Sequence, residues 1–295
     1  MGFRTVIIKN RAKLEHRLNT MIVRGEGGEK KVFIGEINTL IVQSTAVSLT
    51  ASLLNELIKN NIKIIFCDEK SNPSSELLPY YGAHNTSKRY KTQLSWKEST
   101  TARVWQTIVQ RKIIEQANHL ADKGFFEQSD MLLTYASEVE ENDITNREGH
   151  AAKVYFNVFL GLGNSRRDDT FINACLNYGY AVLLSAFNRE IVASGYLTQL
   201  GIWHDNEYNE FNLACDLMEP FRPIVDRTAL SLSEDDGKFK RKMADILNYK
   251  TKIAGKNTTL DIAIRQYVKS VLSALEADDV TEIVFPEIVF VENES

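Results

Sequence analysis

Carboxylates at two separated places in the 295-residue chain have the setting of functional groups. Glu148 lies one turn before Ala152, which belongs to the apolar face of a predicted helix. Asp216 and Glu219 are three residues apart and share a helix face, and Pro220 should end or kink that helix at Glu219. Taken one at a time, these acids are explained more simply as a helix-start residue that interacts with the dipole and as a charged helix end before a proline turn.

His204 adds an imidazole on the predicted loop 201–205, where a lone histidine is usually a solvated or packing residue. Together with two or three carboxylates, it nevertheless forms a donor set for a hard divalent ion. Oxygen ligands suit Mg²⁺ or Mn²⁺, the imidazole tilts the set toward Mn²⁺, and zinc is disfavoured but stays open. An ion held there would stabilise charge on attacking and leaving oxygens, as phosphodiester chemistry requires. By spacing alone, this grouping is one among many.

Two basic runs could contact phosphates. Lys88, Arg89 and Lys91 interleave with an aromatic residue, and Arg166 and Arg167 follow a run that contains two glycines. Charge runs are more often solvated surface, so both interpretations stay open. The sequence contains no Walker loop, no GxSxG and no HExxH motif.

The elements that would position these groups divide the chain into two parts. Runs rich in Val, Ile and Thr predict strands over 3–8, 17–24, 31–34, 37–42 and 62–67, with one helix over 47–59. Helical patterns follow over 96–123, 125–138, 145–160, 169–194, 210–218, 238–247 and 260–275. The predicted fold class is α+β and mainly α, with a small N-terminal β-strand-rich domain over 1–86 and a larger all-helical domain over 87–295.

Composition places the chain among reduced globular proteins. Hydrophobic residues make up 43% and charged residues 25%, which rules out wholesale disorder. The cysteines are odd in number and form no CxxC, which argues against a disulfide framework or a zinc knuckle. No apolar window is long enough to span a membrane, and the first residues are too short an apolar run for a signal peptide. We therefore expect a cytoplasmic protein with no membrane partner.

Four sequence motifs carry a resemblance to one known family. Its members share the order and spacing of these runs: Glu148–Ala152 with Tyr155-Phe156, Leu176–Ala181, Gly201–His204 and Asp216–Pro223. With an N-terminal strand domain before an all-helical domain, the chain resembles the CRISPR-associated adaptation integrase, the catalytic subunit of the spacer-acquisition complex. The resemblance covers essentially the whole chain, and its last motif is specific.

The resemblance implies a site and a reaction. Glu148, His204 and Glu219 would be the metal ligands, and Asp216 a nearby acid that assists them. Many relatives carry Asp where this chain has Glu219, and the longer arm keeps the oxygen ligand. In the implied transesterification, the 3′-hydroxyl of a short DNA duplex attacks a phosphodiester at a repeat border, with Mg²⁺ or Mn²⁺ stabilising the transition state. Many members also cleave DNA, with water or hydroxide as the nucleophile.

The resemblance also implies partners. The family works as homodimers bridged by a smaller second adaptation subunit in a heterohexameric complex on double-stranded DNA, the protospacer and the CRISPR repeat. The N-terminal domain would serve dimerisation or partner binding. Chain length and N-terminal pattern resemble the subtype paired with a single-protein RNA-guided effector nuclease, so that nuclease and a further adaptation protein are candidate partners. Two alternatives stay open: a stand-alone metal-dependent DNA nuclease, and a non-catalytic DNA-binding assembly scaffold.

The charge distribution indicates where DNA could lie. The net charge is −4 and the pI is near 5.8, which by itself argues against coating nucleic acid by bulk charge. However, residues 270–295 contain seven acids and no Lys or Arg, so residues 1–269 carry +3. We therefore expect DNA to bind away from this acidic C-terminal tail.

Overall fold

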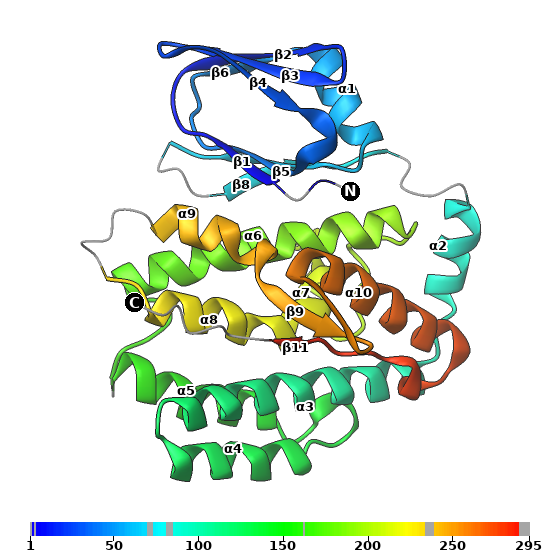
Figure 1. Ribbon diagram of the computed structural model, residues 1–295. Coiled ribbons are helices and arrows are strands. Elements are labelled where there is room, and N and C mark those ends of the chain that lie inside the picture. The colour runs from blue at the N-terminus through cyan, green and yellow to red at the C-terminus, as the bar shows by residue number, and fades with distance from the viewer. Residues whose placement is uncertain are drawn as a thin grey trace. The chain divides into compact units, whose positions relative to one another are not determined.

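The computed structural model describes residues 2, 4–69, 73–80, 85–161, 163–233 and 239–288, and the chain divides into two compact units, residues 1–81 and 82–295. The first unit is built on strands and the second on helices (Figure 1), which confirms the predicted fold class. Residue 86, the predicted boundary, is the first residue of helix α2 (Thr86–Leu94).

The N-terminal unit contains two four-stranded sheets, which Figure 1 shows as two layers. One has the order β1 (Arg4–Ile8), β5 (Ile37–Val42), β7 (Lys63–Cys67) and β8 (Pro73–Leu77), in which only β8 runs antiparallel. The other has the order β4 (Gly28–Phe33), β3 (Thr20–Gly25), β2 (Ala12–Arg17) and β6 (Val47–Leu49), antiparallel except between β2 and β6. Fully buried side chains from both sheets and from α1 (Ala51–Lys59) form one core, including Leu14, Met21, Leu40, Leu53 and Ile64. A short 3₁₀ helix, η1 (Ile34–Glu36), precedes β5.

Several N-terminal elements differ from prediction. β8 and most of β2 lie where no strand was predicted, and Ile34 belongs to η1 and not to a strand. The strand predicted over 17–24 is interrupted by a turn, since Leu18 and Asn19 take positive φ values of 43° and 36° and join β2 to β3. The helix predicted over 47–59 begins only at Ala51, because residues 47–49 pair with β2 as β6. The Thr50 side chain accepts a hydrogen bond from Leu53 N at 3.3 Å and so caps α1.

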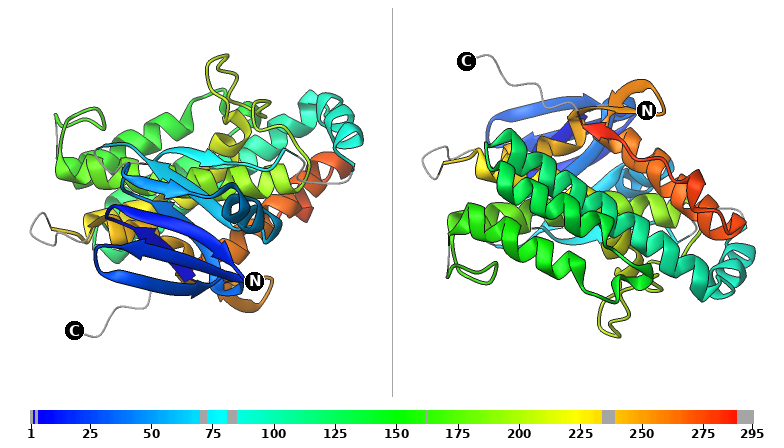
Figure 2. Two further views of the ribbon diagram at one scale, coloured as in Figure 1. Left: turned by 90° about the horizontal axis from the view of Figure 1, so that it is seen from above. Right: turned by 90° about the horizontal axis from the view of Figure 1, so that it is seen from below.

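The C-terminal unit is built around α3 (Glu98–Asp122), which packs against α4 (Phe126–Ser137), α5 (Arg147–Leu160) and α8 (Arg222–Leu230). Figure 1 and the right-hand view of Figure 2, which is seen from below, both show α3 and α4 side by side. A second group packs on α6 (Phe171–Ala193) and consists of α7 (Asn212–Met218), α8, α9 (Phe239–Ala244) and α10 (Leu260–Ala277). The described part of this unit also contains the 3₁₀ helices η2 (Glu141–Asp143), η3 (Glu219–Phe221), η5 (Asp245–Asn248) and η6 (Val280–Glu282).

This unit is not all-helical, contrary to prediction. A small antiparallel sheet has the order β10 (Lys256–Thr259), β9 (Lys250–Ile253) and β11 (Glu287–Ile288). Helices α2 and α8 are further elements that the hydrophobic pattern did not predict. The effect expected of Pro220 is confirmed, since α7 ends at Met218 and α8 begins only at Arg222. None of the described helices is both long and apolar enough to cross a membrane.

Candidate metal centre

Glu148 is held in the first turn of α5 by a carboxylate cap. Asp143 Oδ1 accepts a hydrogen bond from Arg147 N at 2.8 Å, and Asp143 Oδ2 accepts one from Glu148 N at 3.0 Å. These N–H groups have no partner within the helix, and the Asp143 carboxylate also complements the helix dipole. The cap fixes the backbone from which the half-exposed Glu148 side chain reaches Lys112 of α3. Glu148 is therefore both a helix-start residue and a group directed to this site.

Glu219 lies at the break between α7 and α8, with a side chain that is only 5% exposed. Its Oε1 accepts a hydrogen bond from Arg222 Nε at 2.6 Å, and its Oε2 forms an ion pair with Lys112 Nζ. Burial alone would raise the pKa of Glu219, but Arg222 and Lys112 outweigh burial and lower the pKa to about 2. Glu219 is thus an ionised carboxylate in a buried place.

Asp216 is fully buried and organises the loop that carries His204. Its Oδ2 accepts hydrogen bonds from Ile202 N at 2.7 Å and Trp203 N at 3.1 Å, and its Oδ1 accepts one from His204 N at 3.1 Å. The same Oδ1 lies 2.5 Å from His204 Nδ1. A side chain at Gly201 would place Cβ 2.7 Å from Asp216 Oδ2 and 2.3 Å from the carbonyl oxygen of His204, so the loop needs glycine there. Asp216 therefore acts on His204.

The His204 ring is held from two sides. It meets Trp105 of α3 edge to face at 5.9 Å between ring centroids, and Trp105 in turn stacks on Trp203 at 5.5 Å. The hydrogen bond to Asp216 raises the pKa of His204, burial opposes the rise, and the nearby charges of Glu219 and Glu148 add to it. Because Nδ1 faces Asp216, Nε2 is the nitrogen left to bind an ion.

Lys112 is a site residue that sequence reasoning missed. Its side chain is 8% exposed, and its ammonium forms ion pairs with Glu148 Oε1 and Glu219 Oε2. Burial alone would lower the pKa of Lys112, but the carboxylates of Glu219 and Glu148 hold it above its ordinary value. In the sequence Lys112 is one polar residue among those between the apolar positions of a long helix, and its partners lie 36 and 107 residues further along.

Two further side chains, Tyr180 and Asp226, support Glu219 by way of Arg222. The Arg222 guanidinium lies 4.7 Å from the centroid of the Tyr180 ring, which it covers. The Tyr180 hydroxyl donates a hydrogen bond to Asp226, whose pKa burial raises to about 6. The Tyr180 ring, which is itself hydrogen-bonded to Asp226, therefore packs on the guanidinium that pairs with Glu219.

The carboxylates of Glu148 and Glu219 and the imidazole of His204 are suitable donors for a divalent ion, but in this structure they do not converge on one point. Within the described ranges, no three His, Cys, Asp or Glu side chains are arranged so that they could hold a metal ion. The Lys112 ammonium stands between Glu148 and Glu219, and His204 turns one nitrogen to Asp216. Glu219 Oε2 is buried and lacks an aligned hydrogen bond, so an oxygen is oriented for a cation.

Comparison with known proteins decides the family. The family model described as CRISPR associated protein Cas1 matches residues 5–245. The chain belongs to the Cas1 family. It is 33% identical over 297 residues to the CRISPR-associated endonuclease Cas1 of Neisseria meningitidis serogroup C (strain 8013), covering 98% of this chain and 97% of the relative.

Solved structures share the Cas1 fold. A casposase bound to integration product matches with a TM-score of 0.75 at 20% identity, covering 95% of this chain and 93% of the other. A Cas6-RT-Cas1–Cas2 complex matches with a TM-score of 0.71 at 17% identity, covering 95% of this chain and 36% of the larger one. The recognition of the family from its motifs is therefore confirmed.

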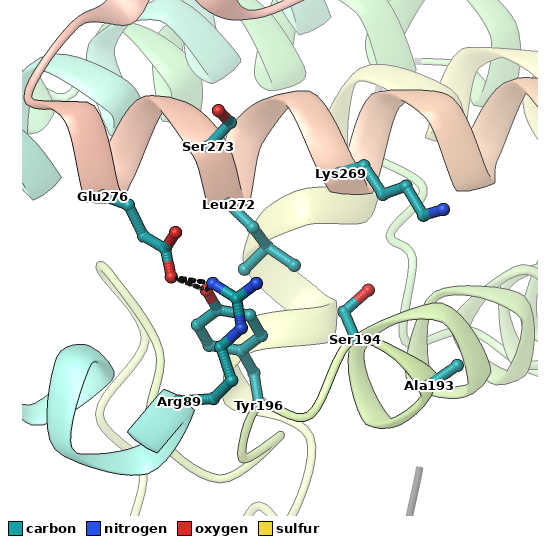
Figure 3. Close-up of a pocket in the computed structure, with 8 residues that line it drawn as sticks. All are labelled: Arg89, Ala193, Ser194, Tyr196, Lys269, Leu272, Ser273 and Glu276. Carbon is teal, nitrogen blue, oxygen red and sulfur yellow. Dashed lines mark hydrogen bonds and ion pairs between the residues drawn. The ribbon is translucent and has the colours of Figure 1, made fainter. Parts of the chain in front are cut away.

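The three basic residues of the first run in this Cas1-family chain have different surroundings in the structure. Arg89 forms an ion pair with Glu276 and donates a hydrogen bond to the Tyr196 hydroxyl at 3.0 Å, at a cavity of about 300 Å³ that Lys269 also lines (Figure 3). Lys88 and Lys91 are exposed instead, around an open hollow on α2. The contact with Glu276 also shows that part of the acidic C-terminal segment neutralises nearby bases.

In the second basic run, too, one arginine has partners within the protein and the other is exposed. Arg166 donates hydrogen bonds to the side chains of Asn173 and Asn177, the latter at 3.0 Å, and lies over the Tyr180 ring at 5.5 Å. Arg167 is exposed. The structure therefore brings Glu148, His204, Asp216 and Glu219 together around α3. Lys88, Arg89 and Lys91 belong to α2, whereas Arg166 lies over the same Tyr180 ring as Arg222, the partner of Glu219. The contact of all five bases with DNA stays a prediction.

Proposed function

We propose that this protein is a divalent-metal-dependent DNA integrase and endonuclease that joins protospacer 3′-OH ends to CRISPR repeat borders by transesterification. This is the reaction of spacer acquisition in adaptive antiviral defence. The observation that carries the proposal is the meeting of Glu148, Glu219 and the Asp216–His204 pair on one face of α3. Membership of the Cas1 family, similarity to a CRISPR-associated endonuclease of Neisseria and the fold shared with a casposase bound to integration product support it.

The chain's own residues have distinct roles in this proposal. Glu148, Glu219 and His204 Nε2 would hold one Mg²⁺ or Mn²⁺, which supplies charge stabilisation for the attacking and leaving oxygens. Asp216 holds His204 through Nδ1 and so presents Nε2, while Arg222 keeps Glu219 ionised and in place. Burial of Glu219 and Asp216 excludes water from the carboxylates and strengthens their attraction for a cation.

The proposal includes an assembly. A Cas2 partner is supported by the fold shared with the Cas1 part of a Cas6-RT-Cas1–Cas2 complex. We place this chain in homodimers that Cas2 bridges on double-stranded DNA in the cytoplasm, with the N-terminal unit as the dimerisation and partner surface. The effector nuclease and a further adaptation protein are candidate additional partners.

An integration assay tests the function. The protein is incubated with a 3′-hydroxyl duplex, a supercoiled repeat-bearing plasmid and Mn²⁺, with and without Cas2. We expect joined product that depends on the 3′-hydroxyl. Nicking without joining would support a stand-alone nuclease, and DNA binding without either reaction would support a scaffold.

His204→Ala and Glu219→Ala test the site in the same assay. Each should abolish joining and leave duplex binding nearly unchanged, because the ligands act on the transition state more than on DNA affinity. Joining at the wild-type rate by either variant would contradict the site assignment.

A further inference from the structure

A buried ammonium lies where the two acidic side chains of the site face each other. Lys112 Nζ contacts Oε1 of Glu148 and Oε2 of Glu219, which come from α5 and η3. The Lys112 side chain is 8% exposed and that of Glu219 is 5% exposed, so little water screens the contact between these two, while Glu148 is 31% exposed. Buried ions of this kind are stable only when they are paired.

Of the two oxygens of Glu219, Lys112 contacts the one that Arg222 does not bind. Arg222 Nε already occupies Glu219 Oε1 at 2.6 Å, which leaves Oε2 toward Glu148. Lys112 contacts this Oε2 without aligned hydrogen-bond geometry, so the attraction is that of a point charge. A divalent ion bound by Glu148 and Glu219 would need the same oxygens at about 2.1 Å.

Two cations cannot occupy this gap together. An ammonium and a divalent ion that contact the same oxygens would lie within a few ångströms of each other, where like charges repel strongly in a poorly screened site. Without any cation, the carboxylates of Glu148 and Glu219 would repel each other instead. The gap therefore holds one cation at a time.

We propose that Lys112 is an internal counter-ion that occupies the cation position between Glu148 and Glu219 and must leave it when a divalent ion binds. Lys112 stabilises the metal-free fold and lowers the affinity for the ion, so the bound metal competes with a residue of the chain itself. This inference rests on the metal site of the proposed function.

Lys112→Met tests the competition, because methionine keeps the apolar stem and removes the charge. Mn²⁺ binding is measured by titration calorimetry on the full-length protein, and thermal unfolding is measured in EDTA and in Mn²⁺. We expect Lys112→Met to bind Mn²⁺ at least tenfold more tightly than wild type does. In EDTA its melting temperature should be lower than that of wild type, and Mn²⁺ should raise its melting temperature by more. Lys153→Met, an exposed change on α5, is the matched control and should behave as wild type.

The outcomes separate this inference from the metal site. Equal or weaker Mn²⁺ binding by Lys112→Met overturns the counter-ion role. This holds also if the variant loses joining activity because Lys112 takes a direct part in the reaction. Absence of Mn²⁺ binding to both proteins overturns the metal site and the inference with it. Binding by wild type that Glu219→Gln abolishes supports the metal site alone.

A measurement on the wild-type protein tests the displacement of Lys112 even if the Lys112→Met variant does not fold. Lysine labelling with an acylating reagent, read by mass spectrometry, reports the accessibility of Lys112 with and without Mn²⁺. We expect protection in EDTA and at least severalfold faster labelling at saturating Mn²⁺, with Lys153 unchanged. A labelling rate of Lys112 that Mn²⁺ does not alter would overturn the displacement.

Discussion

Asp216 grips His204 at two points, since its Oδ1 accepts a hydrogen bond from the His204 backbone N at 3.1 Å and lies 2.5 Å from the ring Nδ1. One buried carboxylate thus fixes both the path of the loop and the direction of the imidazole. Carboxylates that hold a ligating histidine in this way raise its basicity and its preorganisation.

Asp216→Asn should lower the affinity of the site for Mn²⁺ without abolishing binding. The amide keeps the shape of the side chain but turns a donor toward N–H groups that need an acceptor. We expect Mn²⁺ affinity and the joining rate to fall 10- to 100-fold, on the order of losses for residues that orient ligands. Asp205→Asn, an exposed change in the same loop, is the control. Wild-type Mn²⁺ affinity in Asp216→Asn would show that Asp216 does not orient a ligand.

Arg222→Met should reduce both stability and joining. The change leaves Glu219 with one charged partner in a buried place, which costs about 3 kcal/mol of unfolding free energy. Chemical denaturation measures the loss, and the integration assay should show at least tenfold slower joining. Arg241→Met on α9, where the side chain is exposed, should change stability by less than about 0.5 kcal/mol. Equal stabilities of the two variants would contradict the supporting role of Arg222.

The basic residues of α2 should differ in their effect on DNA binding. Lys88→Ala and Lys91→Ala should each reduce the slope of log K against log salt by about 1, because each exposed ammonium can neutralise one phosphate. Arg89→Ala should instead lower the melting temperature and leave the slope nearly unchanged, since Arg89 is engaged by Glu276 and Tyr196. An unchanged slope in both lysine variants would show that Lys88 and Lys91 of α2 do not contact DNA phosphates.

Buried His119 should make stability fall in acid. Burial, helped by the charges of Arg227 and Lys123, lowers the pKa of His119 from 6.5 to about 3. Between these values the unfolded chain carries a proton on His119 that the folded chain lacks. Unfolding free energy therefore decreases as pH falls below 6.5, by at most about 1.4 kcal/mol per pH unit from this group.

His119→Gln removes that contribution. Denaturant titrations between pH 7 and pH 5 should show a shallower pH dependence in His119→Gln than in wild type, even though the loss of stacking on Phe159 lowers stability at every pH. Exposed His150→Gln is the control and should keep the wild-type dependence. The same pH dependence in His119→Gln and wild type would show that the folded protein takes up this proton.

The longer helices with a regular apolar pattern were predictable, whereas helix α2, which is held by polar contacts, was not. Helix α2 buries Gln93, whose side chain bonds the backbone of Leu197 and Leu200 about a hundred residues away. Such contacts leave no periodicity in the sequence. The turn at Leu18-Asn19 was missed for a related reason, since it contains no glycine or proline although both residues have positive φ.

The acids and the histidine of the candidate site were chosen from motif residues in a known order, and the structure places these four residues around α3, while their role as metal ligands stays a prediction. Their grouping came from the family resemblance, since spacing alone left several groupings open. Lys112 lies outside every motif that carries the resemblance, and only the folded chain brings it to Glu148 and Glu219. Likewise, the engagement of Arg89 and Arg166 by internal partners depends on tertiary structure and separates them from Lys88, Lys91 and Arg167.

A crystal structure from Mn²⁺-soaked crystals shows whether Glu148, His204 and Glu219 hold one divalent ion. We predict one anomalous peak with His204 Nε2 and oxygens of Glu148 and Glu219 at about 2.1 Å, and Lys112 Nζ moved out of contact with both carboxylates. A manganese peak elsewhere in the chain, with Lys112 still between Glu148 and Glu219, would contradict this set of ligands.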